Sequence, residues 1–344
     1  MLNVSKLRVR ERAFGRLVGL SGSQFDVLVE AVATEEARRR SEGAPDRLRG
    51  VGGGRKFTLA LEERVLAALL YYRLHLTGHL LSCLFELDES NLWRDRTFHL
   101  QPRLLDVLPV PMQDHLLSCL DDPHSSKPQP QKPRRKRIGT LQELLEAYPE
   151  LRDVCVDGTE QKVPRPKNKA KSRKFYSGKS HCHTLKTQVT SAKRLILHLF
   201  GNVPGQVADR LMLKASGVVR ALDKAASAWT RKAKGHKRPP RLTKRRLFLD
   251  RGYSGIETSY PDVQRVQILA ALKGTGRHKV TLLGQLWNRR LVSRTRIQIE
   301  QNIGHLKNFR VWSGSFRAQT HKHHDTVRVV AGLHNFRQLG KLAW

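Results

Sequence analysis

The stretch Asp153-Val-Cys-Val-Asp157-Gly-Thr-Glu160 decides the fold predicted for the second half of this chain. Val154, Cys155 and Val156 form a short apolar run that ends in an acid and a glycine, as expected of a buried strand that delivers a carboxylate to the edge of a sheet. An aspartate before a glycine is also a common turn residue, because its side chain can bond its own backbone. Asp157 is therefore a candidate site residue only if other acids join it.

The composition indicates a polyanionic partner. The 344 residues include 64 Lys and Arg against 30 Asp and Glu, which gives a formal net charge of +34, and 39% of the residues are hydrophobic. This excess of positive charge favours nucleic acid as the partner. The longest apolar run, at about residues 65–72, is far too short to span a bilayer, and the first residues lack the apolar core of a secretory signal. We expect no membrane partner.

The cysteines give no sign of a metal or disulfide framework. They lie far apart and form no Cys-x-x-Cys pair, which fits a reducing cytoplasm. The cluster His181-Cys182-His183 falls in a predicted strand, where alternation directs Cys182 away from both histidines. We therefore do not expect a zinc site there.

Periodicity and composition divide the chain into four parts. Residues 1–56 contain predicted amphipathic helices and then a basic, glycine-rich linker that includes Arg38–Arg40, and residues 57–120 contain three short predicted helices. Residues 121–139 are rich in Pro, Ser, Lys and Arg, as is typical of an interdomain linker. Residues 140–344 alternate predicted strands and helices, which indicates a mixed α/β domain.

The three helices between residues 57 and 98 are joined by tight turns, an arrangement similar to a helix-turn-helix module. Its third helix would present Arg94 and Arg96 to a DNA groove. A plain helical bundle would give the same apolar pattern, and it is the positive charge of the whole chain that favours DNA binding.

In the α/β part, a second predicted strand repeats the arrangement of the first. Leu247-Phe248-Leu249 is followed by Asp250, and a glycine, Gly252, lies two residues after this acid. Between the two strands we predict a basic hairpin-like excursion over residues 163–179 and one helix over residues 208–229. Two strands thus each deliver an acid at their end.

A predicted helix over residues 296–307 supplies a third acid. At about 100° per residue, Arg296, Glu300 and Lys307 share one face of this helix, next to an apolar stripe that would hold it against the sheet. A surface ladder of ion pairs would explain the same spacing. Because Asp157 and Asp250 each follow a predicted strand as well, the three acids together favour a functional site over a surface ladder of ion pairs.

Three carboxylates brought together repel one another and raise their pKa values unless a cation lies between them. Hard divalent cations such as Mg²⁺ or Mn²⁺ take oxygen ligands, and two ions about 4 Å apart can assist phosphodiester cleavage. We therefore expect Asp157, Asp250 and Glu300 to be metal ligands and catalytic residues, with Arg296 and Lys307 contacting DNA.

Several blocks of the chain resemble the DDE transposases of bacterial insertion sequences, in the insertion-sequence-five group related to Harbinger-type nucleases. The blocks are Asp157-Gly-Thr-Glu160, Arg165-Pro-Lys167, Tyr176-Ser-Gly-Lys179, His183-Thr-Leu-Lys186, Pro204-Gly-Gln-Val-Ala-Asp209, Asp250-Arg-Gly-Tyr253, Arg296-x3-Glu300-x6-Lys307 and Gly332-Leu-His-Asn335. This resemblance implies an RNase H-like catalytic domain preceded by an α-helical, helix-turn-helix-type DNA-binding domain.

The resemblance also implies the identity of the site. Asp157, Asp250 and Glu300 match the metal-binding triad, with Mg²⁺ or Mn²⁺ as two ions. Asp209 is a rival for the second triad position or an accessory acid. Related enzymes have a tyrosine three residues before the arginine of this signature. This chain departs from them, because Ser293 stands at that position before Arg296.

The implied function is that of a transposase that binds terminal inverted repeats and then cleaves and transfers DNA strands at the element's ends and in target DNA. Bringing two ends together implies a homodimer or larger assembly on DNA, in a bacterial cytoplasm at the nucleoid. One alternative is a catalytically silent, sequence-specific DNA-binding protein derived from a transposase. A basic structural RNA-binding protein is a second alternative, but it does not account for the repeated strand and aspartate arrangement.

Overall fold

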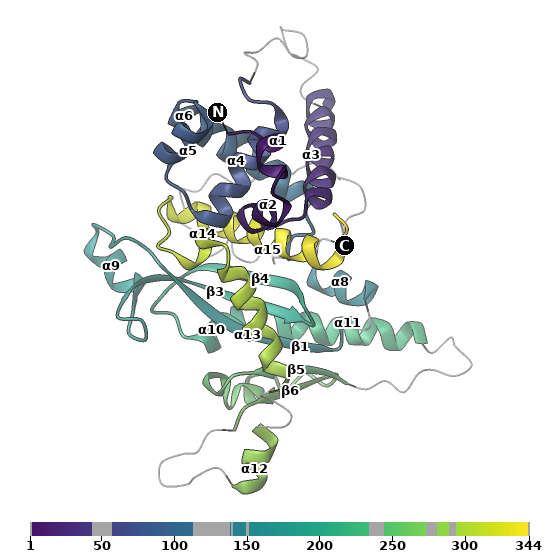
Figure 1. Cartoon of the computed structure of the whole chain (residues 1–344). Coiled ribbons are helices and arrows are strands. Elements are labelled where there is room, and N and C mark those ends of the chain that lie inside the picture. The colour runs from purple at the N-terminus through teal and green to yellow at the C-terminus, as the bar shows by residue number, and fades with distance from the viewer. Residues whose placement is uncertain are drawn as a thin grey trace. The chain divides into compact units, whose positions relative to one another are not determined.

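The computed structural model describes residues 2–42, 57–112, 138, 140–148, 151–233, 244–272, 281–288 and 294–342. The chain is mixed α/β and forms two compact units, which are drawn in Figure 1. We call residues 111–305 the sheet unit, and residues 1–110 together with 306–343 the helical unit. The predicted linker at residues 121–139, apart from Ile138, and the glycine-rich part of the first linker lie outside the described residues.

The sheet unit is built on six strands with the order β2-β3-β1-β5-β6, and β4 pairs with β3. The strands β1, β3 and β4 are antiparallel, whereas β5 runs parallel to β1 and β6 runs parallel to β5. Their bounds are β1 (Asp153–Lys162), β2 (Tyr176–Ser177), β3 (Cys182–Ala192), β4 (Leu195–Pro204), β5 (Arg245–Leu249) and β6 (Val266–Ala270).

Both faces of the central strands are covered by helices. Val154 and Leu247 pack with α8 (Leu141–Ala147) and α11 (Val218–Ala233) in one apolar core. Cys155 and Phe248, one residue further along, point to the other face and pack against Ile299 of α13. Parallel strands buried on both faces read as continuous apolar runs, which is the pattern of Val154–Val156 and Leu247–Leu249.

The helix α13 (Arg294–Lys307) lies in front of the sheet in Figure 1. Its position is fixed by the apolar contacts of Ile299, and by Asn302, which donates a 2.9 Å hydrogen bond to the carbonyl of Lys193 in the turn between β3 and β4. The predicted helix over residues 296–307 is thus present and begins two residues earlier.

Three predicted elements of the sheet unit are wrong in detail. The strand β1 does not end at Asp157 but continues to Lys162, because β3 offers an antiparallel partner along this whole length. The expected hairpin-like excursion contains a helix, α9 (Lys169–Phe175), which Asn168 caps by accepting a hydrogen bond from the N–H of Lys171. The single helix over residues 208–229 is two, α10 (Asp209–Ala215) and α11, since Gly217 adopts a φ of +67° between them.

The helical unit contains the three helices predicted between residues 57 and 98, although their helix-turn-helix role stays a prediction. Residues 306–343, which the sequence grouped with the catalytic part, belong to this unit, where α15 packs against α7. The predicted functional boundaries remain predictions. The helices are α1 (Val4–Arg8), α2 (Glu11–Val18), α3 (Gly22–Glu42), α4 (Leu61–Leu74), α5 (Gly78–Phe85), α6 (Glu89–Arg94), the π-helical η1 (Asp95–Leu100), α7 (Gln101–Val107), α14 (Arg310–Ser313) and α15 (His323–Leu339).

Within the helical unit, α3 continues through Arg38–Arg40, which the sequence assigned to a linker. Arg38 and Arg39 both form ion pairs with Glu35 on the preceding turn, and these pairs support the helix. No helix in the described part of the chain is long and apolar enough to cross a membrane.

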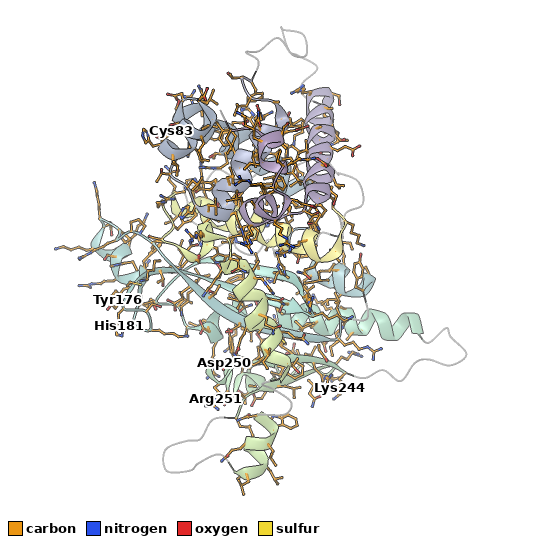
Figure 2. All side chains as sticks on the ribbon, in the orientation of Figure 1. Cys83, Tyr176, His181, Lys244, Asp250 and Arg251 are labelled. Atoms are coloured by element: carbon orange, nitrogen blue, oxygen red, sulfur yellow. The ribbon has the colours of Figure 1, made fainter. Side chains whose placement is uncertain are left out.

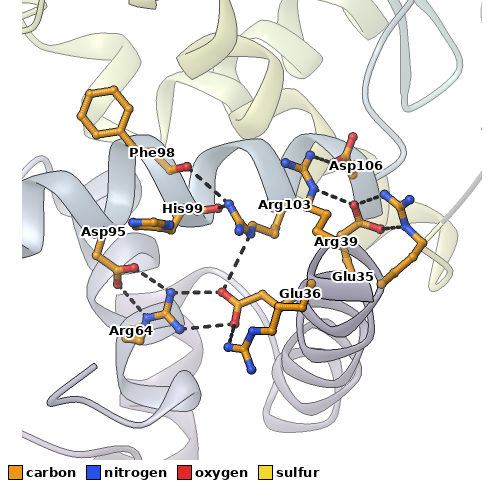
Figure 3. Close-up of polar contacts among 11 residues, drawn as sticks. Glu35, Glu36, Arg39, Arg64, Asp95, Phe98, His99, Arg103 and Asp106 are labelled. Atoms are coloured by element: carbon orange, nitrogen blue, oxygen red, sulfur yellow. Dashed lines mark hydrogen bonds and ion pairs between the residues drawn. The ribbon is translucent and has the colours of Figure 1, made fainter. Parts of the chain in front are cut away.

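A buried network of charges ties the helical unit together (Figure 3). Arg64 of α4, whose side chain is 4% exposed, donates two hydrogen bonds of 2.9 and 2.7 Å to Asp95 of η1 and two of 3.1 and 3.5 Å to Glu36 of α3. Arg103 of α7 lies 3.9 Å from Glu36 and donates a 2.7 Å hydrogen bond to the carbonyl of His99. Removing one member therefore leaves an opposite charge buried beside an incomplete partner set.

We expect Arg64→Met to lower the free energy of unfolding by about 3–5 kcal/mol, because Asp95 stays buried after its arginine is lost. Urea denaturation of the full chain measures the loss. Arg8→Met, which removes the exposed ion pair with Asp26, is the matched control and should cost less than about 1 kcal/mol. Similar losses in both variants would contradict the importance of the buried network.

Candidate active site

Asp157 and Asp250 occupy equivalent positions beside each other on two parallel strands. The register pairs Cys155 of β1 with Phe248 of β5, and each acid lies two residues further along its chain. Because side chains alternate along a strand, both acids lie on the face of Cys155 and Phe248. This is the face that α13 covers.

The helix α13 brings the third acid to the same place. Ile299 is fully buried and Ile303 partly so against the sheet, which fixes the rotation of the helix about its axis. Arg296 and Glu300, one turn apart, then lie beside the two aspartates. Lys307 is exposed at the last position of α13 and belongs to the helical unit.

The guanidinium of Arg296 lies among all three carboxylates. Its Nη1 is 3.1 Å from Oδ1 of Asp250, and its Nη2 is 3.7 Å from both Oδ2 of Asp157 and Oε1 of Glu300. The Arg296 side chain is 16% exposed, against 44% for Asp250 and 60% for Glu300, so the cluster opens to solvent on the side of these two acids. One positive charge faces three negative charges.

The ionised form of Asp157 is disfavoured at this site, mainly because its carboxyl is buried. Burial raises the pKa of the Asp157 carboxyl above its ordinary value, and the negative charges of Asp250 and Asp209 raise it further. The backbone N–H of Gly158, which donates a 2.8 Å hydrogen bond, and the charge of Arg296 oppose this rise without cancelling it. A further cation would therefore stabilise the ionised form of Asp157.

Asp209 lies next to the site but has its own cation. A Cβ added to Gly158 would lie 3.3 Å from Oδ1 of Asp209, so the two segments are in close contact. The same oxygen lies 3.3 Å from Nζ of Lys186 on β3, which also lies 3.5 Å from Glu160 and donates a 2.9 Å hydrogen bond to the carbonyl of Val207. Lys186 therefore joins β1, β3 and the start of α10 beside the candidate site.

Glu160, the last residue of the opening stretch, is an acceptor within this network. Hydroxyls of Ser180 and Thr184 donate hydrogen bonds of 2.8 and 2.9 Å to its carboxylate. Burial works to raise the pKa of Glu160, but hydrogen bonds from hydroxyl groups, including that of Ser177, and the charge of Lys186 outweigh it and lower the pKa. Glu160 thus stays ionised as a structural counter-ion of Lys186.

Sequence reasoning overlooked Tyr253 and the role of Lys186, although both lie in motifs that had been singled out. Tyr253 is 2% exposed, and its hydroxyl makes no hydrogen bond within the described part of the chain. Burial raises the pKa of Tyr253, with added contributions from the charges of Asp209, Asp157 and Asp250. The signal available in the sequence was the tyrosine three residues after the strand-end aspartate.

The two arginines predicted to read DNA lie in the helical unit. Arg94 is exposed at the end of α6, whereas the guanidinium of Arg96 lies over the ring of Tyr71, 3.5 Å from its centroid. Tyr71 thus restricts Arg96, and the role of both arginines at DNA stays a prediction.

Within the described ranges, no group of three or more His, Cys, Asp or Glu side chains is arranged to hold a metal ion. At the candidate site, Arg296 lies among the three acids. The donor chemistry nevertheless fits a hard divalent cation, since the cluster offers carboxylate oxygens and carries excess negative charge. A cation could join these residues if Arg296 gave up its ion pairs.

Comparison with known proteins assigns the chain to a family. The family described as "DDE superfamily endonuclease" matches residues 156–335, which is more than half of the chain and includes all three acids. This chain belongs to the DDE superfamily of endonucleases. It is thus a nuclease or transposase type of enzyme, and the resemblance to insertion-sequence DDE transposases indicated by the motifs is confirmed.

One curated relative of this DDE endonuclease is the "Probable transposase for insertion sequence element IS702" of Microchaete diplosiphon, which is 25% identical over 326 residues, covering 94% of each chain. Two solved structures of Mos1 transposase are also similar. The paired-end complex with the left transposon end is 11% identical, covers 89% of this chain and 84% of its own, and has a TM-score of 0.24. The mariner paired-end complex with Mn is 12% identical, covers 92% and 95%, and has a TM-score of 0.26.

We expect Lys186→Met to destabilise the sheet unit by about 2–3 kcal/mol, because Glu160 and Asp209 lose a cation whose side chain is only 11% exposed. Lys179→Met removes an equal charge from an exposed position and should change the free energy of unfolding by no more than about 0.5 kcal/mol. Chemical denaturation of both variants measures this. An unchanged free energy of unfolding in Lys186→Met would show that the network around Lys186 does not stabilise the sheet unit.

Proposed function

We propose that this chain is a transposase whose nuclease site consists of Asp157, Asp250 and Glu300. The observation that carries the proposal is the convergence of three carboxylates, from β1, from the end of β5 and from α13, on the guanidinium of Arg296. Three carboxylates around one cation repel one another, so a further cation would stabilise their ionised forms. An excess of acids at the open edge of a sheet is suited to binding divalent cations.

We infer an RNase H-like fold for the sheet unit. Support comes from the order β4-β3-β1-β5-β6, with three antiparallel strands followed by two parallel ones. In this arrangement the acids come from the central strand, from its parallel neighbour and from the helix that crosses the sheet. Each acid thus lies on a different element, and the fold sets their spacing.

The three acids would hold Mg²⁺ or Mn²⁺, and two ions are the number suited to phosphodiester chemistry. When bound, such ions neutralise the charge of the phosphate and make water a better nucleophile. Arg296, once released from the carboxylates, would donate a pair of hydrogen bonds to phosphate oxygens, for which its planar fork is suited. Asp209 would support the site through Lys186 and Gly158 as an accessory acid.

DNA is the proposed partner, as terminal inverted repeats and target. The net charge of +34 supports it, and so does the relative whose name assigns it to an insertion sequence element. The helical unit would bind the repeats, with Arg94, Arg96 and Lys307 in contact with the DNA. Joining two ends calls for a homodimer or larger assembly at the bacterial nucleoid.

A second candidate function is a catalytically silent DNA-binding protein that retains the same fold. The specific observation in its favour is that Arg296 already lies among the three acids. The two functions differ in whether a divalent cation can displace this arginine. Both accommodate the charge of the chain.

Nicking of a supercoiled plasmid that carries the element's own ends, with Mg²⁺ or Mn²⁺, tests the nuclease site. We expect Asp157→Asn, Asp250→Asn and Glu300→Gln each to lower the rate at least about 100-fold, because each removes a ligand. Asp209→Asn should lower the nicking rate about 10- to 100-fold, because Asp209 is proposed as an accessory acid. Asp262→Asn, at an exposed position, is the control and should cut at the wild-type rate. Full activity in the three triad variants would overturn the assignment, and a wild-type protein that never cuts would favour the silent alternative.

Arg296→Met should tighten Mg²⁺ binding about 10-fold, since a competing positive charge is removed from among the ligands. Isothermal titration of the DNA-free protein with MgCl₂ gives the Kd. Arg251→Met is the matched control, because Arg251 is an exposed cation next to Asp250 in sequence, and its effect should be smaller. A weaker affinity in Arg296→Met would instead assign Arg296 the role of holding the acids in place for the ion.

A further inference from the structure

A pocket of about 980 Å³ lies in the sheet unit at the starting ends of the strands. It is lined by the segment before β1, the turn between β3 and β4, the starts of β5 and β6, and α13. Most of the polar side chains that line it are cationic or neutral hydrogen-bond donors. The main ones are Arg152, Lys193, Lys244, Arg246, Thr295 and Gln298.

The charge of this pocket is strongly positive. Four of the described lining residues are Lys or Arg, and Asp153 is the acid among them. Asp153 is already bound by Arg246, whose Nε donates a 2.7 Å hydrogen bond to it. With four cations against one acid, the described lining carries a formal excess of three positive charges, and Lys193 and Lys244 are exposed to solvent.

The shape of the pocket is held by fixed backbone. Lys193 adopts a φ of 53° in the tight turn between β3 and β4, and its carbonyl accepts the hydrogen bond from Asn302 of α13. Asn302 is 2% exposed. The lysine side chain therefore extends from an anchored turn.

The helix α13 separates this pocket from the acid cluster. Thr295, Gln298 and the anchoring Asn302 follow the i, i+3, i+7 spacing of one helix stripe, whereas Gln298 is about 160° from both Arg296 and Glu300 around the axis. On β5 the same separation appears along the strand, since Lys244 precedes it and Asp250 follows it (Figure 2). The pocket is thus distinct from the acid site and lies on the other side of the same helix.

We propose that this pocket binds backbone phosphates of the DNA substrate away from the phosphate that is cut. The proposal rests on the proposed nuclease function, and it assigns a second contact on the sheet unit. Ligand pockets for small organic molecules are lined mainly by apolar residues, whereas here eight of the eleven described lining residues are charged or polar. Contacts of this kind fix the position of a duplex without reading its sequence.

The test uses the full chain, without divalent cations, and a fluorescent duplex of about 30 base pairs of arbitrary sequence, whose Kd is measured as the KCl concentration is varied. The double variant Lys193→Gln/Lys244→Gln should lower the magnitude of the slope of log affinity against log salt by about 1.8, because each phosphate contact contributes about 0.9. The control Lys214→Gln/Lys224→Gln removes the same charge from exposed positions on α10 and α11 and should leave the slope within about 0.3 of wild type.

A second variant guards against loss of the fold. Gln298→Glu keeps both lysines and places a carboxylate at an exposed position in the pocket, so DNA affinity should fall while the thermal midpoint stays unchanged. An unchanged slope in the double lysine variant, an equal loss in the control pair, or unchanged affinity in Gln298→Glu would overturn the proposal. A second experiment titrates the protein with inorganic phosphate. If the double lysine variant abolishes phosphate binding but leaves the DNA salt slope unchanged, the pocket binds a small anion and the DNA proposal is overturned.

These measurements are independent of the nicking assay. A smaller salt slope in the double lysine variant, together with a wild-type protein that does not cut DNA, supports the pocket and counts against the nuclease proposal. Metal-dependent nicking by the wild type, together with a slope that the double lysine variant leaves unchanged, supports the nuclease proposal and counts against the pocket. The two proposals can therefore fail separately.

Discussion

Mutual repulsion of three carboxylates is the constraint around which the sheet unit is organised. Asp157, Asp250 and Glu300 can lie within reach of Arg296 only because the surrounding structure holds them there against their like charge. The energy needed comes from apolar burial on both faces of β1 and β5, which positions the strands regardless of what their ends carry. Stable packing thus supports an electrostatically unfavourable edge, as is common at functional sites.

Neighbouring charges are arranged in separate sets, and this separation explains how so many acids can lie close together. Arg296 partners the three acids, while Lys186 partners Asp209 and Glu160 on the far side of Gly158. The first set has one cation for three acids and is partly open to solvent, whereas the second has one cation for two acids and is more enclosed. The acids around Arg296 can exchange this cation for one from solvent, whereas Lys186, Asp209 and Glu160 stabilise the fold.

Much of the site could be predicted because it depends on local patterns. Apolar runs of three residues before an acid placed Asp157 and Asp250 at matching positions of two neighbouring parallel strands, and the helical spacing placed Arg296 and Glu300 on one face. The continuation of β1 past Asp157 could not be predicted, since it depends on β3, which follows about twenty residues later in the chain. The separation of α10 from α11 depended on the conformation of Gly217, which apolar spacing does not reveal.

Other features were beyond prediction for a different reason, because they depend on which segments meet in space. No pattern in the sequence indicates that Lys193, Lys244 and Gln298 line one pocket, or that Arg64 connects Glu36 with Asp95. The grouping of residues 306–343 with the N-terminal helices is of the same kind. Charge and spacing predict the chemistry of single elements, whereas packing determines which distant segments come into contact.

The extension of β1 through Asp157 makes the candidate site unequal in stiffness. Asp157 lies within a strand whose pairing with β3 continues on both sides of it, whereas Asp250 follows the last residue of β5 and Glu300 is 60% exposed on a helix surface. Adjustment to a ligand of a different size would therefore come from Asp250 and Glu300, with Asp157 as the fixed reference. A cluster built in this way keeps one carboxylate fixed while the other two adjust around it.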